Sequence, residues 1–407
     1  MAAKKAVKKP AAAKKTAAPA VKGPVRLGII GLGNMGSEHA KYIKEGKLSR
    51  CVVAAVADRK PEKLEKYQSW DGVETFREGS DLIKSGKVDA VLIATPHFDH
   101  TVLGIMAMKK GLHVLVEKPI SVHRADCERL IAAHTDKKLV FAAMFNQRTI
   151  SAHIKIKKLM DSGELGRITR VNWIISNWFR SAAYYSSGDW RATWAGEGGG
   201  VLLNQCPHNL DLLTWFCGMP SKVRAFCRFG KWHDIEVEDD VTAYLEYPNG
   251  ATGVFITTTG EAPGTNRLEI TGENGKLVYE NGKIKYTRNE ESMIKFCATT
   301  PHSFAAPETW NIDIPGDGSG PQHQGITQNF VDAILDGAKL IAPAAEGIRS
   351  VELANAMLLS SFTDATVKLP ISGPAYEKEL KKRMATSRYG TKVVKESKVD
   401  MSRSIVL

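Results

Sequence analysis

Two side chains able to carry out acid–base chemistry stand out from their surroundings in this 407-residue sequence. Lys118 directly follows an apolar run, HVLVE, and precedes Pro119, which restricts the backbone just after it. A lysine there would place a cation where negative charge develops on a reacting oxygen. His208 follows the Gly198–Gly200 run, and its imidazole could accept a hydroxyl proton near neutral pH. We predict that both are catalytic; the alternatives are a surface lysine and a hydrogen-bonded core histidine.

The residues around His208, in VLLNQCPHNLD, could form a polar cluster. If this segment is helical, Asn204, His208 and Asp211 share one face, because their spacings are four and three residues. Pro207 lacks a backbone donor and tends to bend or restart a helix. We therefore expect His208 to lie over Asp211, and leave the stacking of Asn204 over His208 open.

Alternating strands and helices must position Lys118. Five apolar runs, at 25–30, 51–58, 88–95, 113–117 and 139–145, alternate with segments of helical composition at 35–44, 75–85, 100–110 and 122–137. Continuous apolar strands with helical crossovers indicate a parallel sheet that is buried on both faces. We expect this sheet to carry the catalytic lysine at the carboxyl end of one strand.

A glycine pattern, G-x-G-x-x-G, joins the first strand to the first helix. Gly31 would make the tight turn, Gly33 would let a ligand approach the backbone, and Gly36 would allow close packing of helix on strand. Asp58 ends the second strand 22 residues after Gly36, near the spacing of about 20 expected of an acid that binds the ribose of a dinucleotide. The pattern predicts a dinucleotide site, with a purely structural turn as the alternative.

The acid favours NAD, because Asp58 would repel the 2′-phosphate of NADP. Arg59 beside it could receive that phosphate, so NADP stays possible. His97 and His100 could line the cofactor groove or have no chemical role. The predicted cofactor-binding residues are Gly31, Gly33, Asn34, Met35, Gly36, Asp58, Arg59, Thr95, Pro96, His97, Glu117 and Lys118.

The second half of the chain has signals of antiparallel hairpins. Residues 241–247 and 251–259 flank the turn Pro248-Asn249-Gly250, and Asn281-Gly282 forms another turn between short strands. The aromatic segment 178–194 offers flat apolar surfaces with polar handles that suit sugar rings, or else forms a structural loop. His323 precedes a predicted helix over 325–335 and could reach the site. The predicted substrate-binding residues are Lys118, Asn146, Arg148, Trp190, Arg191, Asn204 and His208.

Composition restricts the class of protein. The net charge is +12, but residues 1–24 hold seven lysines and no acid, which leaves +5 for the rest of the chain. We expect that tail to be disordered and nucleic acid not to be a partner. The sequence has no membrane-length apolar run, secretory signal or disulfide framework, and these absences predict a cytoplasmic protein. It also has no H-E-x-x-H motif or compact Cys/His cluster, so we expect no metal.

Taken together, the glycine loop, ATPHFDH, GLHVLVEKP and GGGVLLNQCPHNLD resemble the glucose-fructose oxidoreductase, inositol dehydrogenase and rhizopine-catabolism (Gfo/Idh/MocA) family over residues 25–365. The resemblance implies that Lys118 lies near a reacting hydroxyl and that His208 relays its proton. It also implies a homodimer or homotetramer built through the C-terminal sheet. Asn204 departs from the inositol dehydrogenase pattern, which has aspartate there, and this weakens the case for a two-residue relay and a simple inositol substrate.

We therefore expect an α/β protein with an N-terminal Rossmann domain followed by an α+β domain with a large, mostly antiparallel sheet. The expected domains are a tail at 1–24, an NAD(P) domain at 25–146, a substrate and oligomerisation domain at 147–365, and a basic arm at 366–407. The expected activity is hydride transfer between NAD(P) and a carbinol carbon of a sugar, glycoside or cyclitol. The alternatives are an NAD-dependent glycoside hydrolase that oxidises its substrate transiently, and a non-enzymatic sensor or nucleic-acid protein.

Overall fold

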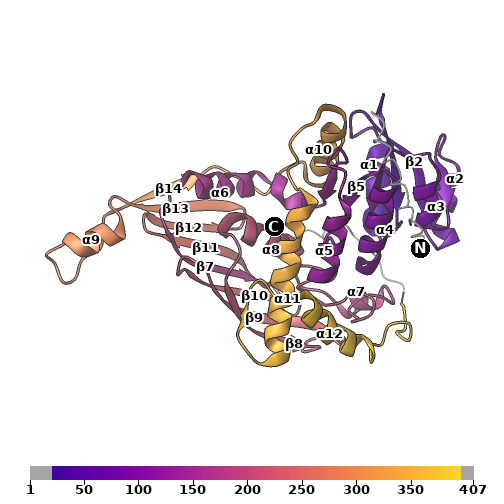
Figure 1. Cartoon of the computed structure of the whole chain (residues 1–407). Helices are drawn as coiled ribbons and strands as arrows, with labels where there is room; N and C mark the ends of the chain where they lie inside the picture. The colour runs from indigo at the N-terminus through magenta and orange to yellow at the C-terminus, as the bar shows by residue number, and fades with distance from the viewer. Residues whose placement is uncertain (1–20, 396–407) are drawn as a thin grey trace, which may run out of the picture.

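Two β-sheets organise residues 21–395, the part of the chain that the computed structural model describes. The first has six strands in the order β3-β2-β1-β4-β5-β6, and all its pairings are parallel. The second has nine strands in the order β14-β13-β12-β11-β7-β10-β9-β8-β15, and only its β7–β10 pairing is parallel. Figure 1 shows the second sheet extending away from the first. The predicted fold class is confirmed.

The first sheet is a Rossmann sheet with helical crossovers. Its strands are β1 (Val25–Ile30), β2 (Cys51–Ala57), β3 (Glu74–Phe76), β4 (Ala90–Ile93), β5 (His113–Val116) and β6 (Phe141–Ala143). The helices between and after them are α1 (Asn34–Lys44), η1 (Pro61–Lys63), α2 (Glu65–Gln68), α3 (Gly79–Lys84), α4 (His97–Lys109), α5 (Arg124–Ala133) and η2 (Asn146–Thr149). The strand order reverses between β1 and β4, and ligands of such sheets bind at the carboxyl ends beside that reversal.

One prediction in this half is wrong. We expected a helix over 75–85, but the segment begins with β3 and only α3 is helical. The strand is three residues long at the edge of the sheet, and none of its side chains is fully buried. It therefore has no apolar run to distinguish it from helix.

The second sheet is built mainly from hairpins. Its strands are β7 (Ile168–Ile175), β8 (Lys222–Phe229), β9 (Glu238–Glu246), β10 (Thr252–Thr258), β11 (Asn266–Gly272), β12 (Gly275–Glu280), β13 (Lys283–Asn289), β14 (Thr309–Ile314) and β15 (Val367–Lys368). Its accompanying helices are α6 (Ser151–Ser162), α7 (Ala182–Ser186), α8 (Pro207–Cys217), α9 (Met293–Thr299), α10 (Gln322–Asp336), η3 (Ala344–Gly347), α11 (Ile348–Thr363) and α12 (Gly373–Met384). The predicted β9–β10 and β12–β13 hairpins are both present.

Helix α10 departs from the expected division of the chain. It lies within residues 147–365, which we assigned to the second domain, yet its apolar side chains Ile326, Phe330 and Val331 join the hydrophobic core of the first sheet. The two halves are therefore packed together through a helix that returns to the Rossmann core after most of the second sheet is complete.

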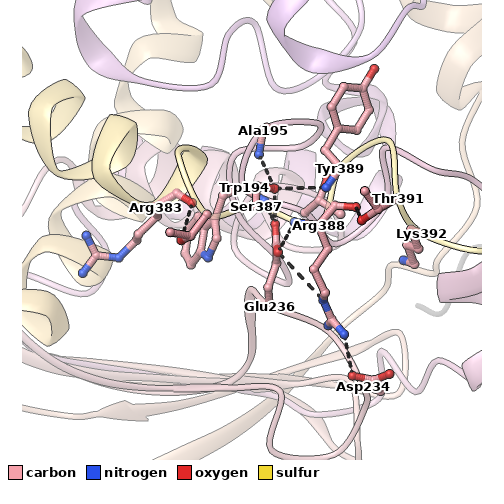
Figure 2. Close-up of polar contacts among 12 residues, drawn as sticks. Trp194, Ala195, Asp234, Glu236, Arg383, Ser387, Arg388, Tyr389, Thr391 and Lys392 are labelled. Atoms are coloured by element: carbon pink, nitrogen blue, oxygen red, sulfur yellow. Dashed lines mark hydrogen bonds and ion pairs between the residues drawn. The ribbon is translucent and has the colours of Figure 1, made fainter.

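The expected trailing arm after residue 365 is also corrected. β15 pairs with β8, and α12 buries Tyr376 and Leu380 completely. These two apolar residues are four apart among lysines, which is one buried helical stripe. The chain then turns back, so that residues 385–395 run beside the loop containing Trp194 (Figure 2). Residues 396–407, and 1–20 of the expected N-terminal tail, lie outside the described residues.

Candidate active site

The glycine loop between β1 and α1 has the geometry expected of a phosphate cradle. Gly31 has a φ of +91°, and a Cβ there would lie 2.7 Å from the Ala94 carbonyl oxygen. A Cβ on Gly36 would lie 1.8 Å from the Gly31 carbonyl oxygen. Gly33 differs, because a Cβ there would meet no described atom within 4 Å. Two glycines thus permit close packing, and the third leaves open space in front of the N-terminus of α1, where backbone N–H groups favour an anion.

Asp58 supports this loop directly. The Leu32 N–H donates to Asp58 Oδ2 at 2.7 Å, and the Lys60 N–H donates to Oδ1 at 2.9 Å. Each carboxylate oxygen keeps a further lone pair that could accept from a ribose hydroxyl. The Arg59 side chain is 68% exposed and lies 3.8 Å from Asp99. The acid is therefore fixed in place, whereas the arginine extends into solvent beside it.

The carboxyl end of β4 adds an unsatisfied polar atom to the crevice. Thr95 Oγ1 is buried, and no residue within 21–395 provides it with a hydrogen-bond partner. The open space at Gly33, the exposed first turn at Asn34 and this hydroxyl together fit a bound dinucleotide. His100 lies between the carbonyls of Thr95 and Pro119, at 2.9 and 2.8 Å, and so links the ends of β4 and β5.

The end of β5 holds Lys118 against the second half of the chain. Its Nζ donates to the Asn204 carbonyl oxygen at 2.9 Å. Desolvation lowers the pKa of Lys118, while the carboxylates of Glu117 and Glu197 oppose that shift. Glu117 points elsewhere: its Oε1 lies 2.7 Å from His39 Nε2. Burial raises the pKa of Glu117, but the hydrogen bond to His39 and the charges of His39, His323 and Lys118 together outweigh burial and bring the value to about 2.

His208 is buried, and its Nδ1 has no hydrogen-bond partner among the described residues. Burial lowers its pKa well below the ordinary value, and the charge of Lys118 lowers it further. The imidazole is therefore neutral at ordinary pH, with a free ring nitrogen. Its edge-to-face neighbour is Phe145, at 6.3 Å between ring centroids.

His208 and Asp211 share α8, as predicted, whereas Asn204, whose place was left open, lies outside that helix. Helix α8 begins at Pro207, so Asn204 lies in the preceding turn. Proline at the first helical position starts a helix rather than continuing one. Asp211 is in α8, but both of its oxygens accept from Arg148, at 2.6 and 2.8 Å. The carboxylate is thus occupied by an ion pair.

Arg148 was expected to bind substrate, but its guanidinium already makes four hydrogen bonds with its five N–H donors. Besides Asp211, it donates to Glu346 Oε2 at 2.6 Å and to the Ile341 carbonyl at 3.2 Å. Its side chain is 2% exposed. We therefore propose a structural role in place of the expected one. Asn146 differs, since its Nδ2 donates to Gln322 at 3.0 Å while its buried Oδ1 has no partner within the described residues.

The aromatic segment does reach the site. The Trp190 ring lies 5.7 Å from the His97 ring, edge to face, so the two halves of the chain meet there. The Arg191 guanidinium lies over the Trp190 ring at 4.7 Å and donates to Tyr184 Oη at 3.0 Å. That hydroxyl donates to Asn204 Oδ1 at 3.2 Å. Trp190, Arg191 and Asn204 are therefore joined in one polar network.

Glu197 is the residue that the sequence analysis missed. Its buried carboxylate accepts from Asn204 Nδ2 and, at 2.6 Å, from the Ala192 N–H. Burial raises its pKa, against the charges of Arg191 and Lys118. A carboxylate thus stands directly behind the amide of Asn204. The available signal was an acid between Gly196 and Gly198, at the start of the glycine run.

His323 lies in the first turn of α10, and its ring is 5.7 Å from the His39 ring. It therefore belongs to the polar network behind Glu117.

None of the helices within residues 21–395 combines the length and apolar character needed to cross a membrane. In the same range, no group of three or more His, Cys, Asp or Glu side chains could hold a metal ion.

Two family descriptions match most of residues 21–395. Residues 25–145 match an oxidoreductase family with an NAD-binding Rossmann fold, and residues 153–278 match the GFO/IDH/MocA C-terminal domain. Myo-inositol 2-dehydrogenase of Thermotoga maritima is 27% identical over 266 residues, which is 63% of this chain and 75% of that protein. Levoglucosan dehydrogenase of Pseudarthrobacter phenanthrenivorans is 24% identical over 391 residues, covering 85% of this chain and 98% of that enzyme.

A solved structure is similar along nearly its whole length. The WlbA dehydrogenase from Bordetella pertussis, in complex with NADH and UDP-GlcNAcA, superposes with a TM-score of 0.73 at 25% identity. The match covers 87% of this chain and 100% of that one. The chain therefore belongs to the Gfo/Idh/MocA family of oxidoreductases and has the NAD-binding Rossmann domain of that family.

Proposed function

We propose that this oxidoreductase transfers a hydride between NAD and a carbinol carbon of a sugar-like ring. The observation that carries the proposal is that the buried His208 has an imidazole nitrogen with no hydrogen-bond partner among the described residues and lies near Lys118, whose Nζ is held by the Asn204 carbonyl. The two are near enough for the lysine charge to lower the pKa of the histidine. Bound NAD supplies the acceptor for the hydride. The protein must supply a proton acceptor and a stabilising charge, and these two residues have those properties.

His208 takes the hydroxyl proton in this scheme. It can do so because burial keeps the imidazole neutral, so its free nitrogen is a base across the ordinary pH range. Lys118 holds the substrate oxygen and stabilises the negative charge that develops on it. Its hydrogen bond to the Asn204 carbonyl fixes the direction of the ammonium. In the reverse direction the same groups donate the proton and stabilise the carbonyl oxygen.

The cofactor-binding residues follow from the crevice. We assign the pyrophosphate to the loop and first turn of α1, and the adenosine ribose to Asp58, with Arg59 beside it. The end of β4 and the residues after β5 face the nicotinamide in this assignment. Asp58 favours NAD, and NADP remains possible through Arg59. The Glu117 carboxylate contributes indirectly, because its Oε2 accepts a hydrogen bond from the backbone N–H of Lys118 at 3.1 Å. The full set is Gly31, Gly33, Asn34, Met35, Gly36, Asp58, Arg59, Thr95, Pro96, His97, Glu117 and Lys118.

The substrate class rests on the network around Trp190 and on the relatives. We assign Asn146, Trp190, Arg191 and Asn204 to the substrate side, together with the two catalytic residues. Inositol and levoglucosan, after which the relatives are named, are compounds rich in ring hydroxyls. An aromatic face flanked by an arginine and amides suits a polyhydroxylated ring. Asn204 stands where the inositol dehydrogenase pattern has an aspartate, and Glu197, which accepts from the Asn204 amide, supplies a carboxylate directly behind it.

We also propose that the second sheet forms a homodimer or homotetramer. Ile174, Ile256, Thr242 and Phe226 are cross-strand neighbours in one row, and Phe226 is 53% exposed. Tyr244, two residues along β9 from Thr242, is 43% exposed on the same face. A wide apolar sheet face of this kind is typical of subunit interfaces. Light scattering measures the resulting mass.

The free cysteines among the described residues support a reducing, cytoplasmic compartment.

The activity is tested by incubating the protein and NAD with myo-inositol, levoglucosan, UDP-GlcNAcA and aryl glycosides, with simultaneous readings of NADH absorbance and released aglycone. We expect NADH to accumulate with at least one ring alcohol. Aglycone release without net NADH would replace the proposal with a redox-cycling hydrolase. No NADH from any compound, with no oxidation of NADH by the corresponding ketones, would contradict hydride transfer to this substrate class.

A further inference from the structure

The C-terminal segment 385–395 lies against the loop that carries Trp190 and Arg191. Figure 2 shows the segment next to Trp194 and Ala195, with Glu236 between the two stretches of chain. Nearly two hundred residues separate the contacting partners along the sequence, as in the hydrogen bond from the Ala195 N–H to Ser387 Oγ at 3.2 Å. The contact is therefore a tertiary one.

Glu236 joins the two stretches. Its Oε1 accepts from the Trp194 N–H at 2.5 Å and from the Ser387 hydroxyl, while its Oε2 accepts from the Arg388 N–H at 2.8 Å. Arg388 adds an ion pair with Asp234 at 2.7 Å, drawn in Figure 2. The start of the segment is thus attached both to the loop and to the turn between β8 and β9.

Lys392 makes the contact nearest the substrate side. Its Nζ donates to the Tyr185 carbonyl at 2.6 Å and to the Arg191 carbonyl at 2.8 Å. The two carbonyls flank the turn that presents Trp190, so one ammonium ties both ends of the turn together. Hydrogen bonds from a charged donor are roughly twice as strong as neutral ones. Lys395 extends the contact, because its N–H donates to the Ser186 carbonyl at 2.9 Å.

Side chains hold part of the turn, since Tyr185 is buried and donates to Thr259 Oγ1 at 2.8 Å, but the backbone of the turn has few other contacts. The other hydrogen bonds of the backbone over 184–191 are local, such as Ser187 N–H to the Tyr184 carbonyl and Arg191 N–H to the Gly188 carbonyl, within the described residues. The next residue, Ala192, has a φ of +52°, a conformation that alanine seldom adopts. The position of the turn therefore depends on contacts from outside it.

We propose that residues 385–395 are a strap that positions the substrate loop, and that Lys392 is its main positioning residue. The inference rests on the proposed function, which gives Trp190 and Arg191 to the substrate. The strap does not touch the glycine loop in any described contact, so it acts on substrate affinity and not on the cofactor. Lys392 is a positioning residue because it holds the backbone at Arg191 and not the reacting atoms.

The test compares Lys392→Met with Lys392→Arg, which keeps the charge, and with Lys381→Met. Lys381 is an exposed lysine on α12 whose partner is Glu377. Hydrogen–deuterium exchange of the full-length protein is followed in peptides covering 184–197. We expect exchange there to be faster by about 10-fold or more in Lys392→Met, because two charge-assisted hydrogen bonds are lost. Lys392→Arg should restore most of the protection, and Lys381→Met should match wild type.

The matching activity readout uses myo-inositol and levoglucosan. We expect Lys392→Met to raise KM by about 10-fold with kcat within about 2-fold and the Kd for NADH unchanged. The strap would be overturned if the loop of Lys392→Met exchanged hydrogen at the wild-type rate, or if the exchange rate rose equally throughout both sheets. It would also be overturned if loop exchange were faster while KM stayed unchanged. If wild type turns over neither compound, the proposed function fails on this panel, while the exchange experiment still decides whether the strap positions the loop.

Discussion

Arg148→Met tests whether the buried arginine holds the fold or binds the substrate. The substitution leaves Asp211 in the core without its partner, and both side chains are 2% exposed. Removing one member of a buried ion pair costs about 3 to 5 kcal/mol. Burial raises the pKa of Asp211, so uptake of a proton offsets part of that cost. We therefore expect the lower end, about 3 kcal/mol, which corresponds to a melting temperature lower by roughly 4 °C for a protein of this size.

The assay is thermal unfolding followed by circular dichroism at fixed protein concentration. Arg26→Met is the control, because its ion pair with Asp89 is at the surface, with the arginine 48% exposed, and should change stability by less than about 1 kcal/mol. The double variant Arg148→Met/Asp211→Leu should recover most of the loss, since apolar replacement of a buried pair is often neutral. An unchanged melting temperature together with a raised KM would refute the structural role and return Arg148 to the substrate site.

Two further predictions concern the glycine loop and the response to acid. Gly33→Ala should keep the wild-type melting temperature but weaken NADH binding about 10-fold or more, since its Cβ enters open space at the pyrophosphate position. Gly36→Ala should instead destabilise the fold, because its Cβ meets the Gly31 carbonyl. Titration of NADH fluorescence and melting curves separate the two variants, and equal behaviour would contradict the assignment. Burial lowers the pKa of His153 from 6.5 to about 4, so the unfolded chain binds more protons in that window and stability should fall by about 3 kcal/mol as the pH drops from 6.5 to 4. In urea unfolding, the free energy of unfolding should depend less steeply on pH for His153→Gln than for wild type. His302→Gln should show the wild-type pH dependence, because His302 is exposed. The same pH dependence in all three proteins would contradict the buried-histidine argument.

The first half of the chain was predictable because its signals are local. The loop glycines lie within six residues, with Gly31 packed against Ala94, Gly36 packed against Gly31 and Gly33 facing open space, and the apolar runs are long enough to mark strands buried on both faces. The three-residue β3 escaped prediction because its side chains are only partly buried. Order and spacing of motifs were therefore sufficient for the Rossmann domain, and insufficient for an edge strand.

The second half contains contacts that the sequence did not reveal. Arg148 appeared free to bind substrate because its partner Asp211 lies 63 residues away in sequence. Glu197 was overlooked because an acid at the start of a glycine run does not show that its carboxylate accepts from Asn204 seven residues later. The folded C-terminal segment was hidden because Tyr376 and Leu380 are two apolar residues in a lysine-rich stretch. Each of these depends on tertiary contacts that a single sequence does not display.

The central claim is that Lys118 and His208 carry out the chemistry of an NAD-dependent alcohol dehydrogenase. The most direct measurement is the rate of NADH formation from the best compound of the panel by wild type, Lys118→Met and His208→Gln, with NADH affinity measured on the same samples. We expect kcat/KM to fall by about 100-fold or more in each variant, while NADH still binds. Variants that bind NADH and retain the wild-type rate would contradict the account.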